Sequence, residues 1–488
     1  LDLPSFVKSC ECMMAVLQLS PIRPEGRFLR CYSLSEPVSS ETDCEYLLNS
    51  NQVTGKDKKV RIQKKQEKNV MIKLFKNVRL KGQKELKMIL VEDGTIKKIA
   101  EQIAVSDEAE VIDLQGYLTV PPYVDPHIHL DYVFTARKEG ALNGTGTLFE
   151  GIQRWSETKS DLTVEEVKQR AIAGIKKEMT AGVQYIRTHA DVTDPNFTSL
   201  KALLELREEL KDIVTIQVVA FPQEGMYAYK GGDELVEEAL KMGADCVGAI
   251  PHYEFAREFG EKSIHKTVDL AVKYDKLIDV HCDETDDDQS RFLELLSALS
   301  YMEGIGSKTT ASHTCSFGSA NNSYAFRLMK LLKKAEINFI SCPTENIYLQ
   351  GRQDTYPKRR GLTRVKELND AKINVCFAQD SMSDPWYPLG NGNMMMILDH
   401  GIHICQMMSF EEIDNALDLI TVNGAKTMHI QDEYGLEEGK PANFIVLEAK
   451  TEFDAVCERA GILASVRNGE YLLKKEPQVI QTNIEILK

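Results

Sequence analysis

The chain has 488 residues, of which 43% are apolar and 27% are charged, and its formal net charge is −15. A chain of this length can bury a large core and form more than one folding unit. The acidic balance argues against a nucleic-acid surface, which needs clustered Lys and Arg. No run approaches the roughly 20 apolar residues that span a bilayer. The composition therefore favours a small neutral ligand.

The eleven cysteines follow no spaced framework, so we expect reduced, mostly buried thiols in a cytoplasmic protein. Four of them crowd residues 1–69, a stretch with the basic run Lys56–Lys68 and no sustained hydrophobic periodicity. We expect this stretch to be a poorly ordered extension. Its arginines would suit a transit peptide, but its acidic residues count against one. The chain also lacks an initial Met, so a fragment of a longer sequence explains this stretch equally well.

Residues 70–120 and 431–488 have the pattern of short β-strands separated by turns. Apolar alternation over Leu86–Val91 and the turn Asp93-Gly94 predict a hairpin, and Asn468-Gly469 marks a similar turn near the other end. We expect the two flanking segments to pair into one small β-sandwich.

Residues 121–430 alternate predicted strands with predicted helices. Thr163-Val-Glu-Glu166 has the pattern of a capping box at a helix start, and a helix over Asp233–Met242 is expected to stop at Gly243. Strands alternating with helices imply a parallel sheet, and eight such units imply a closed (β/α)8 TIM barrel of the α/β class. The eight expected strands are Leu118–His129, Val183–His189, Val214–Phe221, Cys246–Ile250, Leu277–Cys282, Thr309–His313, Asn338–Cys342 and Asn374–Ala378.

In such barrels the catalytic side chains follow the carboxyl ends of the strands. Most of the ten histidines fall at these places. His127 and His129 alternate at the end of one strand, so both imidazoles point to the same face and can bind one ion. On its own, this pair could instead be two barrel histidines that form hydrogen bonds and bind no metal. The polar residues expected at this end are His127, His129, His189, Asp191, Gln223, His252, His281, Glu284, His313, Asp380 and Ser381.

Three imidazoles and one carboxylate suit Zn²⁺ or Fe²⁺ better than Mg²⁺ or Ca²⁺. The expected metal ligands are His127, His129, His281 and Asp380. We expect one divalent ion per subunit, because the end of the fourth strand offers no lysine for a bridging carbamate. We expect His189, Asp191 and His252 to orient the ligands rather than to bind the ion themselves.

Several motifs together resemble the bacterial cytosine deaminases of the amidohydrolase superfamily, over roughly residues 70–475. They are Pro126-His-Ile-His-Leu-Asp131, Thr147-Leu-Phe-Glu-Gly-Ile152, Ala220-Phe-Pro-Gln-Glu-Gly225, Gly248-Ala-Ile-Pro-His252, Ile278-Asp-Val-His-Cys-Asp-Glu284, Ala311-Ser-His-Thr314, Asp354-Thr-Tyr-Pro-Lys-Arg-Arg-Gly361 and Asp384-Pro-Trp-Tyr-Pro-Leu-Gly390. The resemblance implies hydrolytic deamination of a free pyrimidine base, cytosine to uracil plus ammonia. It also implies bound Fe²⁺ or Zn²⁺ and a homo-oligomer, often a hexamer.

The resemblance also implies roles for individual residues. Glu284 would shuttle protons, and His313 would orient the attacking water. Gln223 would read the amide edge of the ring, and Trp386 would form a wall of the pocket. Asp380 would take a proton from water, whose pKa a bound divalent ion lowers from 15.7 to about 7.

Ser381 departs from the cytosine deaminase pattern. There a second Asp follows the metal aspartate, within Gly-His-Asp-Asp, whereas this chain has Ala378-Gln379-Asp380-Ser381. The smaller side chain is expected to leave room for a 5-methyl group on the ring. We therefore expect activity on 5-methylcytosine, giving thymine, at least equal to that on cytosine.

Two alternatives stay open. Fold and metal do not select the substrate, so another cyclic amidine or amide, such as isocytosine, isoguanine or creatinine, would suit the same site. A non-catalytic scaffold that kept the barrel is a function of another class, and the retained ligands and Glu284 argue against it. The zinc deaminases that act on bases in nucleic acids are excluded, because their P-C-x-x-C motif is absent from the sequence.

Overall fold

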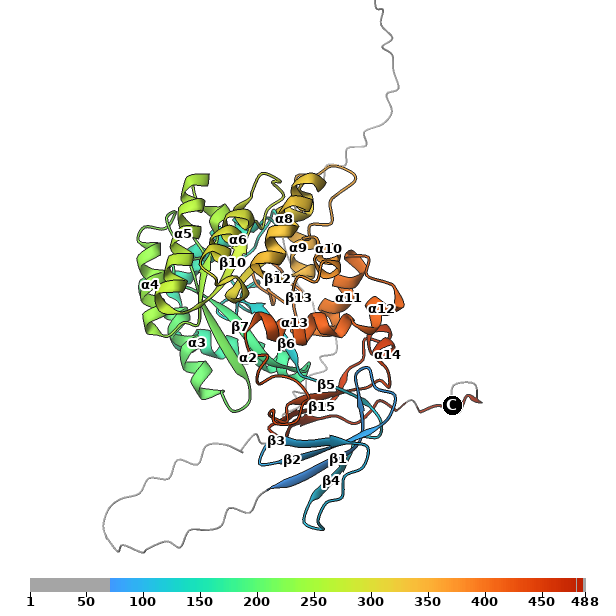
Figure 1. Ribbon diagram of the computed structural model, residues 1–488. Coiled ribbons are helices and arrows are strands. Elements are labelled where there is room, and N and C mark those ends of the chain that lie inside the picture. Colours follow the sequence, from blue (N-terminus) through green and yellow to red (C-terminus); the bar gives the residue numbers. More distant parts are fainter. Residues whose placement is uncertain (1–70, 480, 486–488) are drawn as a thin grey trace, which may run out of the picture. The chain divides into compact units, whose positions relative to one another are not determined.

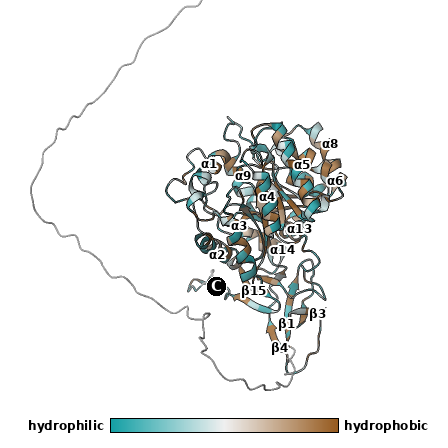
Figure 2. Ribbon diagram, turned by 90° about the vertical axis from the view of Figure 1, so that its left-hand side faces the viewer, coloured by the Kyte–Doolittle hydropathy of each residue, from teal (hydrophilic) through white to brown (hydrophobic). Residues whose placement is uncertain are grey.

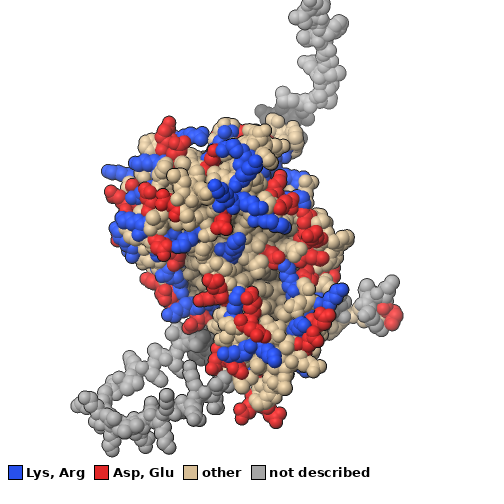
Figure 3. All heavy atoms as spheres, in the orientation of Figure 1, with Lys and Arg blue, Asp and Glu red and all other residues tan. Residues whose placement is uncertain are grey.

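The computed structural model describes residues 71–479 and 481–485 (Figure 1). The predictions for residues 1–69 lie outside these residues. None of the helices in the described part of the chain combines the length and the apolar character that a membrane crossing requires. On the face seen in Figure 3, acidic and basic side chains are interspersed over the surface.

Eight parallel strands in chain order form one of two eight-stranded sheets. They are β6 (Tyr123–Ile128), β7 (Val183–Asp191), β8 (Thr215–Phe221), β9 (Cys246–Ala249), β10 (Leu277–Cys282), β11 (Thr309–His313), β12 (Asn338–Ser341) and β13 (Val375–Phe377). Beyond the end of β13, the Asp380 N–H donates to the His127 carbonyl at 2.8 Å, and the His129 N–H donates to the Asp380 carbonyl at 3.2 Å. These bonds join the last strand to the first, and the predicted TIM barrel is confirmed.

Helices follow these strands along the chain, except α14, which lies between two strands of the other sheet. They are α1 (Leu148–Thr158), α2 (Val164–Thr180), α3 (Thr198–Glu209), α4 (Gly232–Met242), α5 (Arg257–Tyr274), α6 (Phe292–Met302), α7 (Cys315–Ser319), α8 (Asn322–Ala335), α9 (Pro343–Leu349), α10 (Val365–Asp370), α11 (Met394–Ile404), α12 (Phe410–Asp414), α13 (Val422–Thr427) and α14 (Glu452–Cys457). Figure 2 shows hydrophobic and hydrophilic residues along the same helices, as expected for helices that cover a sheet.

The starts and ends of two helices follow their sequence signals. Thr163 caps α2 by accepting from the Glu166 N–H at 3.2 Å. The reciprocal half of the predicted capping box does not form, because the Glu166 carboxylate pairs with Lys138 and Arg170 instead. Helix α4 ends at Gly243, whose φ of 117° is a conformation that favours glycine.

The two flanking segments form a second, mixed sheet. Its strands are β1 (Ile72–Leu80), β2 (Lys87–Glu92), β3 (Thr95–Ala100), β4 (Glu110–Asp113), β5 (Leu118–Val120), β14 (Phe444–Leu447), β15 (Ile462–Arg467) and β16 (Glu470–Lys474). The order is β16-β15-β14-β5-β1-β2-β3, with β4 also paired to β1. Strand β14 therefore joins the two segments through β5. Phe75 and Phe444 pack edge to face in its core, with ring centroids 5.0 Å apart.

The strand predicted over Leu118–His129 is two strands in the structure. Its first part, β5, belongs to the mixed sheet, and its second part, β6, begins the barrel. Pro121 and Pro122 stand between them, and proline cannot donate to a sheet ladder. The apolar run is therefore divided between two sheets at the prolines.

A buried ion pair lies inside the barrel. Arg187 on β7 is fully buried, and its Nη1 donates to Asp279 Oδ2 at 3.0 Å. Its Nη2 donates to the Thr427 carbonyl at 2.9 Å. Burial alone would raise the pKa of Asp279, but hydrogen bonds and nearby positive charge bring that pKa below its usual value. Asp279 is therefore a carboxylate that depends on its partners.

We expect Arg187→Met to destabilise the fold by about 3–5 kcal/mol, because it leaves the Asp279 carboxylate buried without its cation. The double variant Arg187→Met/Asp279→Asn removes both charges and should lose less. The midpoint of urea unfolding measures both effects. A single variant that unfolds at the wild-type midpoint would contradict this assignment.

Candidate active site

The four residues predicted as metal ligands meet at the carboxyl end of the barrel. His127 lies on β6 and His129 follows it, His281 lies on β10, and Asp380 follows β13. His129 Nε2 and His281 Nε2 are 3.1 Å apart. Asp380 Oδ1 is 3.6 Å from Nε2 of both His127 and His129. His127, His129 and His281 can therefore hold one ion together, and the Asp380 carboxylate lies beside two of these imidazoles.

The state of these side chains fits a bound divalent cation. Burial, and then the neighbouring imidazoles, lower the pKa values of His127, His129 and His281 well below the ordinary value. Neutral imidazoles offer a lone pair, which is what a metal ligand needs. His127 Nε2 and Asp380 Oδ2 are buried without a hydrogen-bond partner in the protein. A buried polar atom left unpaired is costly, and a cation at this point would satisfy both.

A hydrogen-bonded chain fixes the orientation of His127. Its Nδ1 is 3.0 Å from Ser312 Oγ, and this hydroxyl donates to Asp279 Oδ1 at 2.6 Å. Nε2, on the other side of the ring, is thereby aimed at the centre of the cluster. The ring of His189 packs on His127 with centroids 4.0 Å apart. His189 thus contacts a predicted ligand, as expected for a residue that orients one.

Glu284 and His313 lie beside Asp380. His313 Nδ1 is 3.4 Å from Glu284 Oε1 and 3.6 Å from Asp380 Oδ2. Asn346 Nδ2 donates to Glu284 Oε1 at 2.9 Å. Burial, reinforced by the nearby Glu345 carboxylate, raises the pKa of Glu284 well above its usual value. Burial also lowers the pKa of His313 to about 3. Glu284 is therefore the group of this pair that favours a bound proton.

A small cavity adjoins this cluster. It is lined by His129, Tyr132, Leu148, Gln223, Ile250, His281, Glu284, Glu345, Asp380 and Trp386. Gln223 is buried, and its Oε1 has no partner in the protein. The rings of Tyr132 and Trp386 pack with centroids 4.5 Å apart. The cavity thus combines flat apolar walls with an unpaired amide, which suits a planar polar ring.

Trp386 lies against α1 at a glycine. A Cβ atom at Gly151 would be 2.4 Å from Trp386 Nε1, so only glycine allows this contact without a shift. The indole N–H donates to the Leu148 carbonyl at 3.2 Å. The motif around Gly151 therefore helps to place a wall of the cavity.

Ser381 is not among the residues that line the cavity, although it is fully buried beside Asp380. Asp380 has a φ of 64°, in the left-handed region where the chain turns sharply. Glu345 and Asn346 on α9 take part in the site instead, and sequence reasoning missed both. They follow β12, the one predicted strand to which no functional residue was assigned, and the strand-end rule itself would have found them.

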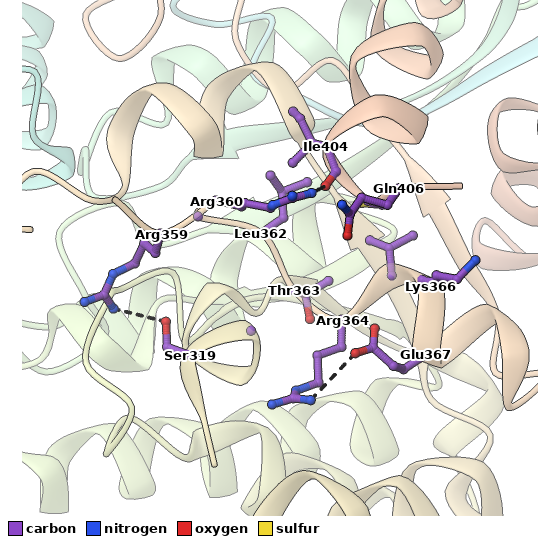
Figure 4. A pocket seen from close by; sticks show the side chains of 14 residues that line it. Ser319, Arg359, Arg360, Leu362, Thr363, Arg364, Lys366, Glu367, Ile404 and Gln406 are labelled. Carbon is purple, nitrogen blue, oxygen red and sulfur yellow. Dashed lines mark hydrogen bonds and ion pairs between the residues drawn. The ribbon is translucent and has the colours of Figure 1, made fainter. Parts of the chain in front are cut away.

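A larger pocket lies elsewhere, beside α7, α10 and the end of α11 (Figure 4). Its basic side chains are engaged with the protein. Arg359 Nη1 donates to Ser319 Oγ at 3.0 Å. Arg360 Nη1 donates to the Ile404 carbonyl. These arginines brace the loops that they join, and none of the predicted site residues lines this pocket.

A closed parallel barrel with histidines and an aspartate converging at its carboxyl end defines a metal-dependent hydrolase. Residues 110–471 match the model of the Amidohydrolase family. The match covers well over half of the chain, and the chain belongs to this family, with a divalent metal as its expected cofactor.

Individual relatives cover most of the chain. A crystal structure of 5-methylcytosine deaminase from Klebsiella pneumoniae, liganded with 5-fluorocytosine, is 50% identical and has a TM-score of 0.82; the match covers 84% of this chain and 99% of that chain. N-isopropylammelide isopropyl amidohydrolase from Pseudomonas sp. (strain ADP) is 30% identical over 79% of this chain and 93% of its own length. Pterin deaminase from Rhizobium rhizogenes is 26% identical, over 74% of this chain and 82% of its own length.

We expect His281→Ala to lower affinity for the divalent metal by at least about tenfold, because a ligand atom is lost from the centre of the cluster. Metal analysis of the purified protein after dialysis measures this. The matched control is His265→Ala, an exposed histidine on α5, which should keep the wild-type metal content. Equal metal content in both variants would remove His281 from the ligand set.

Proposed function

We propose that this amidohydrolase deaminates a free pyrimidine base of the cytosine type by hydrolysis, releasing ammonia. The observation that carries the proposal is the cavity. His129, His281 and Asp380 of the ligand cluster line it together with the unpaired amide of Gln223 and with Glu284. The 50% identity to a 5-methylcytosine deaminase, over nearly the whole of that chain, supports the same substrate class.

Gln223 is the residue that we assign to base recognition. Its amide can donate to the O2 carbonyl and accept from N1–H at once, which matches the uncharged lactam edge of cytosine. Tyr132 and Trp386 supply aromatic faces beside it. A planar neutral base satisfies this cavity better than a charged ligand does.

The metal is the second part of the proposal. We assign one Fe²⁺ or Zn²⁺ per subunit, because three imidazoles and a carboxylate suit these ions. The ligands would be His127, His129, His281 and Asp380. Such an ion supplies hydroxide at neutral pH by lowering the pKa of water from 15.7 to about 7.

The protein's own groups handle the protons. Asp380 takes the proton that water loses, and His313 orients the attacking water. Glu284, whose raised pKa favours the protonated carboxyl, protonates N3 of the ring and later passes a proton to the departing amine. Asn346 holds Glu284 Oε1, which leaves the other oxygen to carry the proton. Water adds at C4, the C4–N bond breaks, and a carbonyl and ammonia remain.

Ammonia release by the metal-reconstituted protein tests the proposal, with cytosine, 5-methylcytosine, isocytosine and creatinine assayed in parallel. We expect release from the first two bases. Release from isocytosine or creatinine alone would keep the chemistry and change the substrate. No ammonia release from any of the four compounds would contradict the deaminase proposal.

In the same assay, Glu284→Gln should lower turnover by about 10²–10⁴-fold while the metal content stays unchanged, because the amide cannot transfer the proton. Glu367→Gln makes the same change at an exposed site on α10 and should leave turnover as it is. Near-normal turnover of Glu284→Gln would remove this residue from the mechanism.

We further propose that the small side chain of Ser381 favours 5-methylcytosine, giving thymine. Ser381→Asp should lower the ratio of activities on 5-methylcytosine and cytosine by about tenfold or more, since one methyl group in a pocket is worth about 1–3 kcal/mol. Activity on cytosine is the internal control for an intact site. An unchanged ratio would show that Ser381 does not select at C5.

A further inference from the structure

A third carboxyl group shares the cavity with Glu284 and Asp380. Glu345 lies on α9, just past the end of β12, and is 3% exposed. An oxygen of each of the three side chains lies within 4.8 Å of the others. Glu345 Oε2 is buried without a hydrogen-bond partner in the protein. A buried oxygen of this kind, on a side chain that lines a cavity, calls for a donor from a ligand.

The polar atoms beside this carboxyl group do not satisfy it. Asp380 Oδ2 and Ser381 Oγ are likewise buried without a hydrogen-bond partner in the protein. A carboxyl group keeps an acceptor oxygen in either protonation state, so Glu345 can accept a hydrogen bond from a ligand.

The order of the strands sets which part of a base Glu345 faces. Around the barrel, Gln223 follows the third strand, Glu284 the fifth and Glu345 the seventh. Around a cytosine ring, the N1–O2 edge, N3, and C4 with its amine follow one another in the same sense. With Gln223 at the N1–O2 edge and Glu284 at N3, the next group in the circle faces the amine.

Building on the proposed deaminase function, we propose that Glu345 is a specificity-determining residue that accepts a hydrogen bond from the exocyclic amine of the base. The reaction replaces this amine, a donor, with a carbonyl oxygen, an acceptor. A protein oxygen that accepts a hydrogen bond from the amine of the substrate therefore repels the carbonyl oxygen of the product. Glu345 selects the amino-bearing base and promotes release of the oxo-bearing one.

Ser381 can act on the substrate through Glu345. Ser381 does not line the cavity, but it lies next to Glu345. A change at Ser381 would act on the base by moving Glu345.

The test measures binding rather than turnover. Calorimetric titration of the metal-loaded Glu284→Gln protein with cytosine and with uracil gives two dissociation constants without conversion of the substrate. Adding Glu345→Leu should weaken cytosine binding by about tenfold and leave uracil binding unchanged or tighter, because a hydrogen bond to an ionised or polarised acceptor is lost. Adding Glu345→Gln, which retains a carbonyl acceptor, should recover part of the preference.

Metal content is measured for each variant, so that damage to the ligand cluster is seen directly. Glu367→Leu in the same background is the control outside the cavity and should leave both constants unchanged. An unchanged cytosine-to-uracil preference in the Glu345→Leu variant overturns the inference, and so does equal weakening for both bases. If that variant loses its metal, the Glu345→Gln variant decides, and a preference within about twofold of the parent overturns the inference.

The two proposals fail differently. Wild-type protein that releases no ammonia and binds neither base overturns the deaminase function itself. Wild-type protein that deaminates cytosine, with a base preference that Glu345 does not alter, overturns only the role of Glu345.

Discussion

The contact between the first and last strands of the barrel determines whether this site exists. Asp380 donates its backbone N–H to His127 and accepts from the N–H of His129, so one residue both joins the strands and supplies a carboxylate. His281 comes from the opposite side of the circle and completes the cluster. If the barrel did not close at this point, the imidazoles and the carboxylate would belong to separate strands with no common centre.

Burial then sets the charge of each group. It removes the proton from the histidines by lowering their pKa values and favours a proton on Glu284 by raising its pKa. The two opposite shifts have one cause, because a low-dielectric interior disfavours whichever form is charged. The same end of the barrel thus holds neutral imidazoles, which can bind a metal, beside a carboxyl group that can donate a proton. Asn346 orients the Glu284 carboxyl group by donating a hydrogen bond to one of its oxygens.

Much of the barrel could be predicted, and the failures have local physical causes. The bounds of β10 and β11 agree with the expected strands because short apolar runs end there in His281-Cys282 and His313. The first strand was predicted too long, since an apolar run continues across prolines that divide it between two sheets. The four proposed ligands could be inferred because each lies at, or just past, the carboxyl end of a strand. Glu345 was missed because the strand-end rule was not applied past the end of β12, and Ser381 was placed in the cavity wall because sequence does not reveal the left-handed turn at Asp380. The roles assigned to these residues remain predictions.

The pairing of β14 with β5 bears on how this chain folds during synthesis. The strand β5 is complete long before β14, and the whole barrel sequence is made between them. One edge of β5 therefore stays unpaired on the ribosome until the last part of the chain emerges. An exposed strand edge can pair with another chain, so the nascent protein passes through a stage in which aggregation competes with folding. The short length of β5, Leu118–Val120, limits how much edge is open to such pairing.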